Sequence, residues 1–527
     1  MIYTARTAYE VPQLDLLSFL FDSPVSLATE NTVVHAEAAN PSNGITKALA
    51  RTLTRRIADT LRYSYGIGQH GPGKDIVVAG GVASLASPSF KAEELARQIK
   101  QGSAKLCIAC PISQSILSEA AHLSGLSPNL CLVLDSSSPW RLYMASDPAA
   151  RNMVGKSELE WERITDKDEL ENSLICLLYS SGTTGPPKGV KMSHTNMVSE
   201  AFIVGANLRE HWRKEGKWDY RTLAHLPSAH VAGGYFVIPF YHGGTTYWMP
   251  KFDFVDFLAF NRALEITSFF SVPPIYLLIS KSPLVKDHFR ALRTAVSGAA
   301  PLGKELQALA SKKLGVFLTQ TWGLSETTGS TTGSETNVED LSGSVGPVLP
   351  NVEVRIVDDS GNDCSPNTPG EVLVRGPIVT KGYYNDPKTN SETFRDGYLC
   401  TGDIGFFQDG RLHIVDRKKE LIKYKGNQVA PAELEAVLLS HPKILDAGVI
   451  GIYDAEQCTE VPRAYVVADK ALISAREIED FVASHLASHK QLRGGVEFVE
   501  AIPKSASGKI LRKDLRALAG NKLKAKL

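Results

Sequence analysis

Short apolar runs rich in β-branched residues alternate with helical stretches through residues 1–350. Residues 75–78, 105–109, 129–135 and 173–179 are strand-like, and residues 91–102 have the apolar spacing of an amphipathic helix. Strands that alternate with helices of this length predict parallel sheets covered by helices. We therefore expect an α/β fold for this part of the chain.

The pattern changes near residue 350. Residues 351–357 and 370–375 alternate as strands do around turn-forming segments, which predicts a small antiparallel β element up to about residue 380. Helix, strand, strand and helix are then predicted at 431–442, 446–453, 463–469 and 475–486. The sequence thus indicates a large N-terminal domain of helix-covered sheets plus the β element, residues 1–415, and a small α+β C-terminal domain, residues 416–527, with Asp416 near the joint.

Length, charge and hydropathy narrow the class of protein. A chain of 527 residues, 43% of them hydrophobic, is longer than one hydrophobic core usually grows. Lys and Arg balance Asp and Glu at 57 each, so no field of one sign favours a nucleic acid or an anionic membrane, and a small ligand is the better expectation. No apolar run is long enough to span a bilayer and the N-terminus lacks the features of a secretory signal, so we expect a soluble intracellular protein.

The cysteines favour a reducing compartment. Seven in a chain of this length form an odd, sparse set rather than a disulfide framework. Cys107 and Cys110 have the spacing of a redox or metal pair, but no second pair has a comparable spacing. We interpret both as buried strand cysteines.

The last three residues, Ala525, Lys526 and Leu527, resemble the peroxisomal address of the Ser-Lys-Leu type. The alternative is a solvated basic tail that ends this way by chance. We expect the peroxisomal matrix, otherwise the cytoplasm, as the location of the protein. The peroxisomal import receptor is then a partner, and fatty-acid or side-chain metabolism would agree with that location.

A glycine- and hydroxyl-rich loop follows the strand-like residues 174–179 and ends at Lys188. Its glycines let backbone N–H groups converge on an anion, the hydroxyls add donors and the lysine adds charge. It is not a Walker loop, because Pro186 and Pro187 separate Gly185 from Lys188. The later Gly508-Lys509 pair lacks the other Walker residues, so a P-loop kinase or GTPase is disfavoured. A mobile surface turn is the alternative to a phosphate loop.

Seven further motifs follow this loop, within residues 226–234, 271–283, 295–306, 320–328, 397–405, 415–435 and 503–509. Together they resemble the adenylate-forming superfamily, which includes acyl-CoA synthetases, 4-coumarate-CoA ligases, luciferases and peptide-synthetase adenylation domains. The segments SGAAPLGKEL and KELIKYKG are most similar to the 4-coumarate-CoA ligase branch. The resemblance implies an ATP-dependent acid-CoA ligase that forms an acyl adenylate, releases AMP and pyrophosphate, and uses magnesium.

The resemblance also implies a nucleotide site. Asp403 has the chemistry to accept from both ribose hydroxyls, Arg417 would contact the same sugar, and Glu326 would be the magnesium-linked acid. Without the motif, each would be interpreted as an ordinary turn acid or surface ion pair. The other residues implied are Ser180, Ser181, Gly182, Thr183, Thr184 and Lys188 at the β- and γ-phosphates, Ala299, Gln320 and Thr321 at the adenine or acyl adenylate, Ser325 at the α-phosphate, and Lys419 beside the nucleotide.

Lys509 is the strongest catalytic candidate, because a point cation can contact the carboxylate and the α-phosphate together and reduce their repulsion. Thr184, Glu326 and His230 are the other residues that the resemblance assigns to catalysis. In the family the lysine lies on a mobile C-terminal domain that rotates between two half-reactions. On the other face of this domain, matching positions are Lys423 and Gln428 for the adenylate and Lys425 and Gly426 for CoA, with Lys251 as a further CoA contact.

The acyl pocket departs from the 4-coumarate pattern. His230 matches a residue that guards the carboxylate site, whereas His225 is expected to be structural. Two positions after His230, 4-coumarate ligases have an aromatic hydroxyl-bearing residue where this chain has Ala232, which removes a hydrogen-bond partner and widens the pocket. We expect a medium-chain fatty or arylalkanoic acid. Asn427, where the plant ligases have Phe, affects local packing.

Only 18 residues follow Lys509, so free CoA is favoured over a carrier domain as the acceptor. Two other functions stay open. One is a luciferase-like oxidation of the adenylate, which oxygen-dependent light would reveal. The other is a nucleotide-binding homologue without catalysis, against which the complete set of motif residues speaks.

Overall fold

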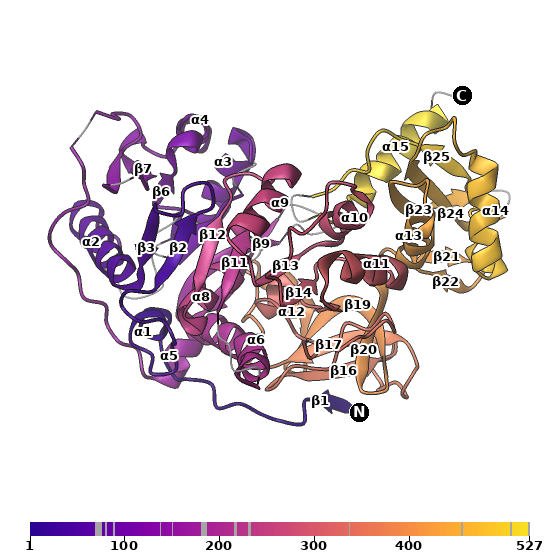
Figure 1. The fold of residues 1–527 in the computed structure, drawn as a ribbon, viewed down its shortest axis with the longest axis horizontal. Helices are drawn as coiled ribbons and strands as arrows, with labels where there is room; N and C mark the ends of the chain where they lie inside the picture. The colour runs from indigo at the N-terminus through magenta and orange to yellow at the C-terminus, as the bar shows by residue number, and fades with distance from the viewer. Residues whose placement is uncertain are drawn as a thin grey trace.

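The computed structural model describes residues 1–68, 76–78, 82–87, 90–137, 139–149, 151–180, 187–214, 219–229, 233–336, 338–454, 457–505 and 508–524. The N-terminal sheets and their helices form the larger part of the molecule, and the C-terminal residues form a smaller part beside α10 (Pro273–Lys281) and α11 (Lys304–Leu314) (Figure 1). The predicted division into a large and a small part is thus confirmed.

The largest sheet has seven strands in the order β10-β9-β5-β4-β6-β7-β8. Its inner strands are parallel, as predicted, but both edges are antiparallel, because β9 and β10 form one hairpin and β7 and β8 another. Helices α3 (Ala92–Gly102) and α4 (Gln114–Ser124) pack on it over a common core. The strands are β4 (Ile76–Val78), β5 (Val82–Leu85), β6 (Leu106–Ala109), β7 (Cys131–Asp135), β8 (Arg141–Met144), β9 (Leu174–Ser180) and β10 (Lys188–Ser193).

Two smaller sheets complete the α/β region. One has the order β11-β12-β2-β3 and the other is the parallel sheet β13-β14-β15. The strands are β2 (Val33–Glu37), β3 (Gly44–Thr46), β11 (Arg221–Ala224), β12 (Thr245–Trp248), β13 (Ser268–Ser271), β14 (Thr294–Ser297) and β15 (Leu318–Gln320). Other helices of this region are α1 (Leu16–Phe21), α2 (Lys47–Tyr65), α5 (Lys167–Asn172), α6 (His194–Lys214), α8 (Ile238–His242) and α9 (Phe254–Ala263).

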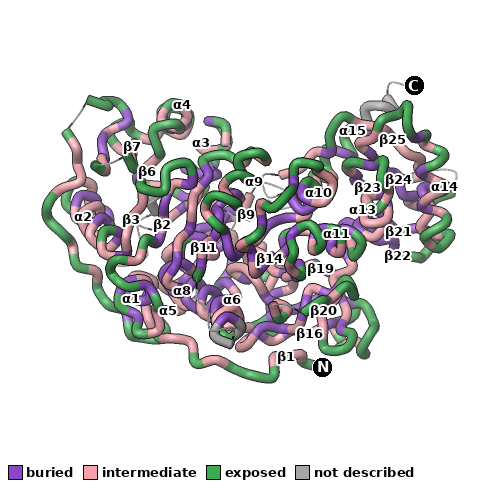
Figure 2. The backbone as a smooth tube through the Cα atoms, viewed as in Figure 1, coloured by how far each residue is buried: buried purple, intermediate pink, exposed green. Residues whose placement is uncertain are grey.

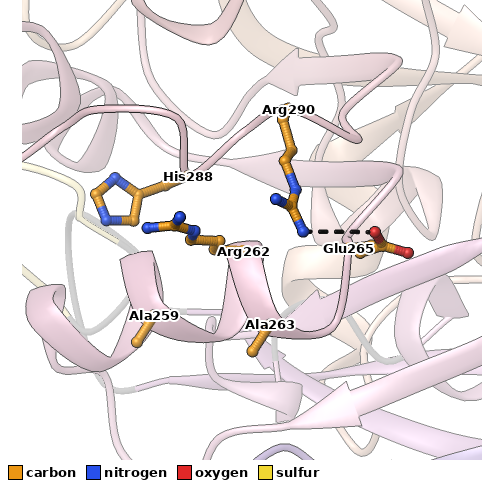
Figure 3. Close-up of a pocket in the computed structure, with 6 residues that line it drawn as sticks. All are labelled: Ala259, Arg262, Ala263, Glu265, His288 and Arg290. Carbon is orange, nitrogen blue, oxygen red and sulfur yellow. Dashed lines mark ion pairs between the residues drawn. The ribbon is translucent and has the colours of Figure 1, made fainter.

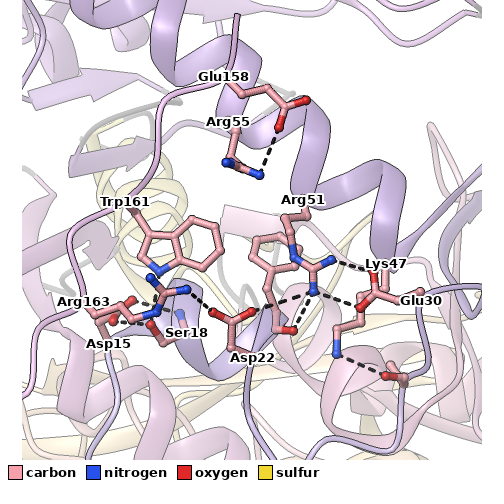
Figure 4. Close-up of polar contacts among 12 residues, drawn as sticks. Asp15, Ser18, Asp22, Glu30, Lys47, Arg51, Arg55, Glu158, Trp161 and Arg163 are labelled. Carbon is pink, nitrogen blue, oxygen red and sulfur yellow. Dashed lines mark hydrogen bonds and ion pairs between the residues drawn. The ribbon is translucent and has the colours of Figure 1, made fainter.

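A polar network ties the connection after β8 to α1 and α2 (Figure 4). Asp15 caps α1 by accepting from the Ser18 backbone N–H at 2.9 Å, and Trp161 Nε1 donates to Ser18 Oγ at 3.1 Å. Arg163 forms an ion pair of 2.9 Å with Asp22. The long connection therefore lies fixed along the helices.

The predicted antiparallel element is larger than the sequence pattern indicated. Its strand order is β1-β16-β17-β19-β18, with β20 paired to β19, so the N-terminus joins it as an edge strand. The strands are β1 (Ile2–Thr4), β16 (Glu353–Val357), β17 (Gly370–Arg375), β18 (Phe394–Arg395), β19 (Tyr398–Gln408) and β20 (Arg411–Arg417), and α12 (Pro387–Thr393) precedes β18.

The C-terminal part has its own hydrophobic core, in which Val449, Val466 and Val482 are fully buried. Purple, buried backbone lies along its strands (Figure 2). The predicted helix, strand, strand and helix are α13 (Pro431–Ser440), β23 (Asp446–Asp454), β24 (Thr459–Val467) and α14 (Ala475–His485), to which the structure adds β21 (Ile422–Tyr424), β22 (Asn427–Val429), β25 (Val496–Phe498) and α15 (Arg512–Lys524).

Asp416 joins the two parts. It pairs with Ile404 inside β20, so the predicted boundary falls within a strand, and its buried carboxylate accepts from the Ala432 N–H of α13 at 3.0 Å and from the Arg417 N–H at 2.7 Å. Burial raises the pKa of Asp416, although Arg512 opposes this. One side chain therefore holds the end of the large sheet region against the first helix of the C-terminal part.

The cysteine prediction is half wrong. Cys107 is buried, and burial raises the pKa of its thiol to about 12, but Cys110 is exposed because β6 ends at Ala109 and Pro111 begins a 3₁₀ turn. None of the seven cysteines, all within the described residues, forms a disulfide. Among the described helices, none combines the length and apolar character needed to cross a bilayer.

Candidate active site

The parallel strands β13, β14 and β15 end side by side, at Ser271, Ser297 and Gln320. Loops that follow the carboxyl ends of parallel strands form the binding crevice in open α/β sheets. Ala299 follows β14 in a left-handed conformation, φ 69°, which a non-glycine residue adopts at some cost. This brings Ala299, Gln320 and Thr321 to one edge of the sheet.

The side chains of Gln320 and Thr321 already form hydrogen bonds within the protein. The buried Gln320 amide donates to Gln307 Oε1 at 2.9 Å and to the Leu302 carbonyl at 3.3 Å. Thr321 Oγ1 donates to the Thr332 carbonyl at 2.6 Å. The Gln320 side-chain amide therefore bonds inside the protein and braces the sheet edge, whereas the motif predicts this residue beside the adenine or the acyl adenylate.

Asp403 and Arg417 are paired across strands β19 and β20, with Arg417 Nε 2.9 Å from Asp403 Oδ1. Trp322 Nε1 donates to Asp403 Oδ2 at 2.8 Å. The carboxylate is buried, and Oδ1 has no aligned hydrogen-bond donor among the described residues, since its contact with Arg417 is an ion pair only. A buried carboxylate with unused acceptor capacity suits a ligand that brings hydroxyl donors.

Glu326 lies in the 3₁₀ turn η4 (Ser325–Thr327), where Leu324 N–H donates to Thr327 Oγ1 at 2.8 Å. The Tyr383 hydroxyl donates to Glu326 Oε1 at 2.8 Å. Burial, followed by the charge of Glu326, raises the pKa of Tyr383, so the phenol stays protonated. The acid is therefore oriented before any ligand arrives.

Lys188 begins the edge strand β10, opposite Ser180 of β9. Its Nζ donates to Thr389 Oγ1 at 2.7 Å, lies 3.7 Å from Asp386 Oδ2, and stands 5.4 Å from the centre of the Tyr383 ring. Ser180 and Lys188 thus mark the two ends of the predicted phosphate loop. Ser181, Gly182, Thr183 and Thr184 lie outside the described residues, as do His230 and Ala232.

Lys509 comes from the C-terminal part and is half-buried against this site. Burial lowers the pKa of its ammonium to about 8, and repulsion from Arg417 adds to that effect. The carboxylates of Asp403 and Glu326 oppose it. Electrostatic effects of this kind act at short range, so Lys509 lies within electrostatic reach of all three side chains, although it is far from them in the sequence.

Contacts between the two parts hold this arrangement. A Cβ placed on Gly508 would lie 3.3 Å from side-chain atoms of Val272 and Pro274, at the start of α10. At the other end of that helix, Lys281 Nζ donates to the Ile444 carbonyl. Helices α11 and α13 also lie in contact. The loop that carries Lys509 is thereby pressed against the N-terminal part.

The residues predicted for the second half-reaction lie on the protein surface, away from Lys509. Lys425 and Gly426, at φ 45° and 83°, form the two-residue turn between β21 and β22, as in hairpins with a type I′ turn. This turn, with Lys423 and Gln428, is exposed on the side of the C-terminal part remote from α10 (Figure 1). Lys251, on the N-terminal part, is also exposed, as is Lys419.

Sequence reasoning missed four side chains of the site: Trp322, Tyr383, Asp386 and Thr389. Trp322 stands inside a motif, but nothing in its spacing signals a contact with Asp403. His225, in contrast, is structural as predicted: its Nε2 is 2.9 Å from Ser271 Oγ, and burial lowers its pKa to about 4.

A surface depression on α9 is separate from this site (Figure 3). Its charges are mutually paired, with Arg290 3.6 Å from Glu265 and Arg262 3.1 Å from Asp287. It contains none of the predicted site residues.

Comparison with known proteins shows the family of the chain. The sequence matches the profile described as AMP-binding enzyme over residues 76–384 and the AMP-binding enzyme C-terminal domain over residues 433–509. It is 47% identical over 543 aligned positions to a protein of Emericella nidulans named as an acyl-coenzyme A synthetase, with 98% of each chain covered.

Two further relatives have named substrates. The phenylacetyl-CoA ligase epaB of Aspergillus niger is 33% identical over 99% of this chain and 100% of its own, and 4-coumarate--CoA ligase 2 of Nicotiana tabacum is 38% identical over 83% and 80%. Among solved structures, ATP-bound MatB from Rhodopseudomonas palustris aligns with a TM-score of 0.79 at 26% identity, covering 96% of this chain and 98% of that one.

Proposed function

Because this chain belongs to the family of AMP-binding enzymes, we propose that it is an acyl-CoA synthetase whose acid substrate is a medium-chain fatty acid or an arylalkanoic acid. Its reaction is that of an AMP-forming acid-thiol ligase: ATP and the acid give an acyl adenylate and pyrophosphate, and the CoA thiol then displaces AMP. The choice of acid is supported by Ala232 and by the name of the 33% identical phenylacetyl-CoA ligase.

One observation carries the mechanism: the loop with Lys509 packs against the N-terminal part, where its ammonium is within electrostatic reach of Asp403, Arg417 and Glu326. Asp403 would accept from the ribose hydroxyls, and Arg417, whose Nε lies 2.9 Å from Asp403 Oδ1, would contact the same sugar. Lys509 would then contact the substrate carboxylate and the α-phosphate oxygens. Both groups carry negative charge as they approach, so a cation between them stabilises the transition state more than the separated reactants.

The residues present also fit a magnesium ion. Within the described residues, no three His, Cys, Asp or Glu side chains gather closely enough to hold a metal by themselves. One carboxylate, that of Glu326, accepts from the hydroxyl of Tyr383, whose ring lies beside Lys188, and Mg²⁺ is commonly held by one or two carboxylates plus substrate phosphates. Bound there, the ion would neutralise phosphate charge, while Glu326 would hold and orient it.

For thioester formation, we propose that residues 416–527 turn about Asp416. Lys509 would then leave the adenylate site. The hairpin would take its place, so that Lys423 and Gln428 face the adenylate and Lys425 and Gly426 face CoA. Lys251, on the N-terminal part, would be a further CoA contact. His230 would guard the carboxylate site. This movement must break the Lys281–Ile444 hydrogen bond, the packing around Gly508 and the contact between α11 and α13.

The direct test is acid-dependent AMP formation with ATP, Mg²⁺ and CoA. The panel contains straight-chain acids of graded length, phenylacetate, cinnamates and branched hydroxy acids. A clear optimum among medium-chain or arylalkanoic acids supports the proposal, and an optimum at cinnamates contradicts the substrate class. Oxygen-dependent light would favour a luciferase-like reaction, and no pyrophosphate release with any acid would favour a non-catalytic homologue.

We also propose that Ala525, Lys526 and Leu527, which lie outside the described residues, direct the protein to peroxisomes through the import receptor. A fluorescent protein fused to the N-terminus should enter peroxisomes with the full chain and stay in the cytosol when these three residues are removed. Equal distributions would contradict the proposal.

A further inference from the structure

Tyr383 lies between the cation and the acid of the candidate ATP site. Its hydroxyl donates to Glu326 Oε1 at 2.8 Å, and the Lys188 ammonium stands 5.4 Å from the centre of its ring. Lys188 and Glu326 come from segments far apart in the sequence, and this one side chain contacts both.

The backbone around Tyr383 is held on both sides. The Tyr383 N–H donates to Asn390 Oδ1 at 2.7 Å, and the Asn390 amide returns a bond to the Tyr383 carbonyl at 3.0 Å. Three residues before it, Thr380 N–H donates to the Glu326 carbonyl at 2.9 Å. Tyr383 is itself buried, at 8% exposure, and forms a bridge with Val190 of β10. Its hydroxyl therefore has little freedom to turn away from Glu326.

A group fixed in this way can preset the geometry of its partner. A carboxylate that is free to rotate loses rotational freedom when it binds a metal, whereas a carboxylate that a phenol already holds in place does not. The Tyr383 hydroxyl donates to Oε1 of Glu326 at 2.8 Å. Oε1 is then occupied, which leaves the other carboxylate oxygen for the metal.

We propose that Tyr383 is a positioning residue for ATP binding: its hydroxyl orients Glu326 toward the metal that accompanies ATP, and its ring supports the Lys188 ammonium beside the phosphates. This inference rests on the proposed function for its ligand. Tyr383 then makes two contributions to ATP binding that the motifs do not distinguish. The contribution of the hydroxyl requires the metal, and the contribution of the ring does not.

The test compares Tyr383→Phe with Tyr384→Phe. The first removes only the hydroxyl, and the second alters the adjacent tyrosine, whose backbone N–H bonds to the Gly189 carbonyl and whose side chain packs against the cluster of Leu177 and Tyr179. ATP binding is titrated calorimetrically with Mg²⁺ and with EDTA. Since hydrogen bonds to charged groups are the stronger ones, we expect Tyr383→Phe to raise the half-saturating Mg²⁺ concentration about 10-fold and to leave binding in EDTA unchanged. Tyr384→Phe should match the wild type.

A third variant, Tyr383→Leu, also removes the ring and should weaken ATP binding in EDTA as well. Thermal unfolding and CoA-dependent turnover of preformed acyl adenylate serve as folding controls for each variant. An unchanged Mg²⁺ dependence in Tyr383→Phe, or an equal shift in Tyr384→Phe, would overturn the inference. If no acid in the panel yields AMP with the wild type, the proposed function fails, whereas the ATP titrations still decide the role of Tyr383.

Discussion

Glu200 on α6 is buried in a way that makes the stability of the protein depend on pH. Its side chain is 8% exposed, Oε1 accepts from the Ser330 N–H at 2.7 Å, and Oε2 has no hydrogen-bond partner among the described residues. Burial raises the pKa of this carboxyl from 4.5 to about 8, and the bond from Ser330 only partly opposes it. The folded protein therefore holds a proton on Glu200 at pH 7, where the unfolded chain does not.

The direction in which stability changes with pH follows from the linkage between proton binding and folding. A group with a raised pKa in the folded state contributes stability that is complete below its unfolded pKa and is lost as the pH rises toward its folded pKa. Each pH unit between the two values corresponds to about 1.4 kcal/mol, so the loss is about 1 kcal/mol at pH 5 and about 4 kcal/mol at pH 8. Glutamine is neutral at every pH and escapes this loss.

We therefore expect the stability difference between Glu200→Gln and the wild type to shift in favour of the variant by about 3 kcal/mol between pH 5 and pH 8. Any effect of the amide on the free energy of unfolding that does not depend on pH cancels in this comparison. Urea unfolding followed by tryptophan fluorescence is a suitable assay, because Trp212 is fully buried on the same helix. A difference that stays constant from pH 5 to pH 8 would refute the reasoning.

The remaining predictions concern the two half-reactions. Lys509→Ala should abolish acid-dependent pyrophosphate release yet spare ATP binding and CoA-dependent turnover of preformed acyl adenylate; equal loss of both half-reactions would contradict its role. Asp403→Ala should weaken ATP binding about 10-fold or more, as expected for loss of charge-assisted hydrogen bonds to the ribose, and calorimetry would show it. Lys281→Ala removes the bond to the Ile444 carbonyl and should slow adenylation more than thioester formation, which single-turnover rates of the two steps would reveal.

Local pattern was enough to find most elements of the fold. The parallel inner strands, the antiparallel region and the helix-strand-strand-helix order of the C-terminal part all follow from hydrophobic periodicity and turn residues, which act over a few neighbouring positions. Antiparallel edges such as β8 and the addition of β1 to a distant sheet were not predicted, because strand pairing depends on partners far along the chain.

Some features of the candidate site also follow from the sequence, and others depend on the tertiary structure. By itself, the sequence determined the order of the motifs, the charge of Lys509 and the acid at Asp403, since each is a property of residue type and spacing. Only the tertiary structure decided that Lys509 comes within electrostatic reach of Asp403 and Glu326, that the Gln320 amide turns inward, and that Tyr383 contacts both Glu326 and Lys188. These contacts join segments that are distant in the chain, and packing of whole domains, not local propensity, brings such segments together.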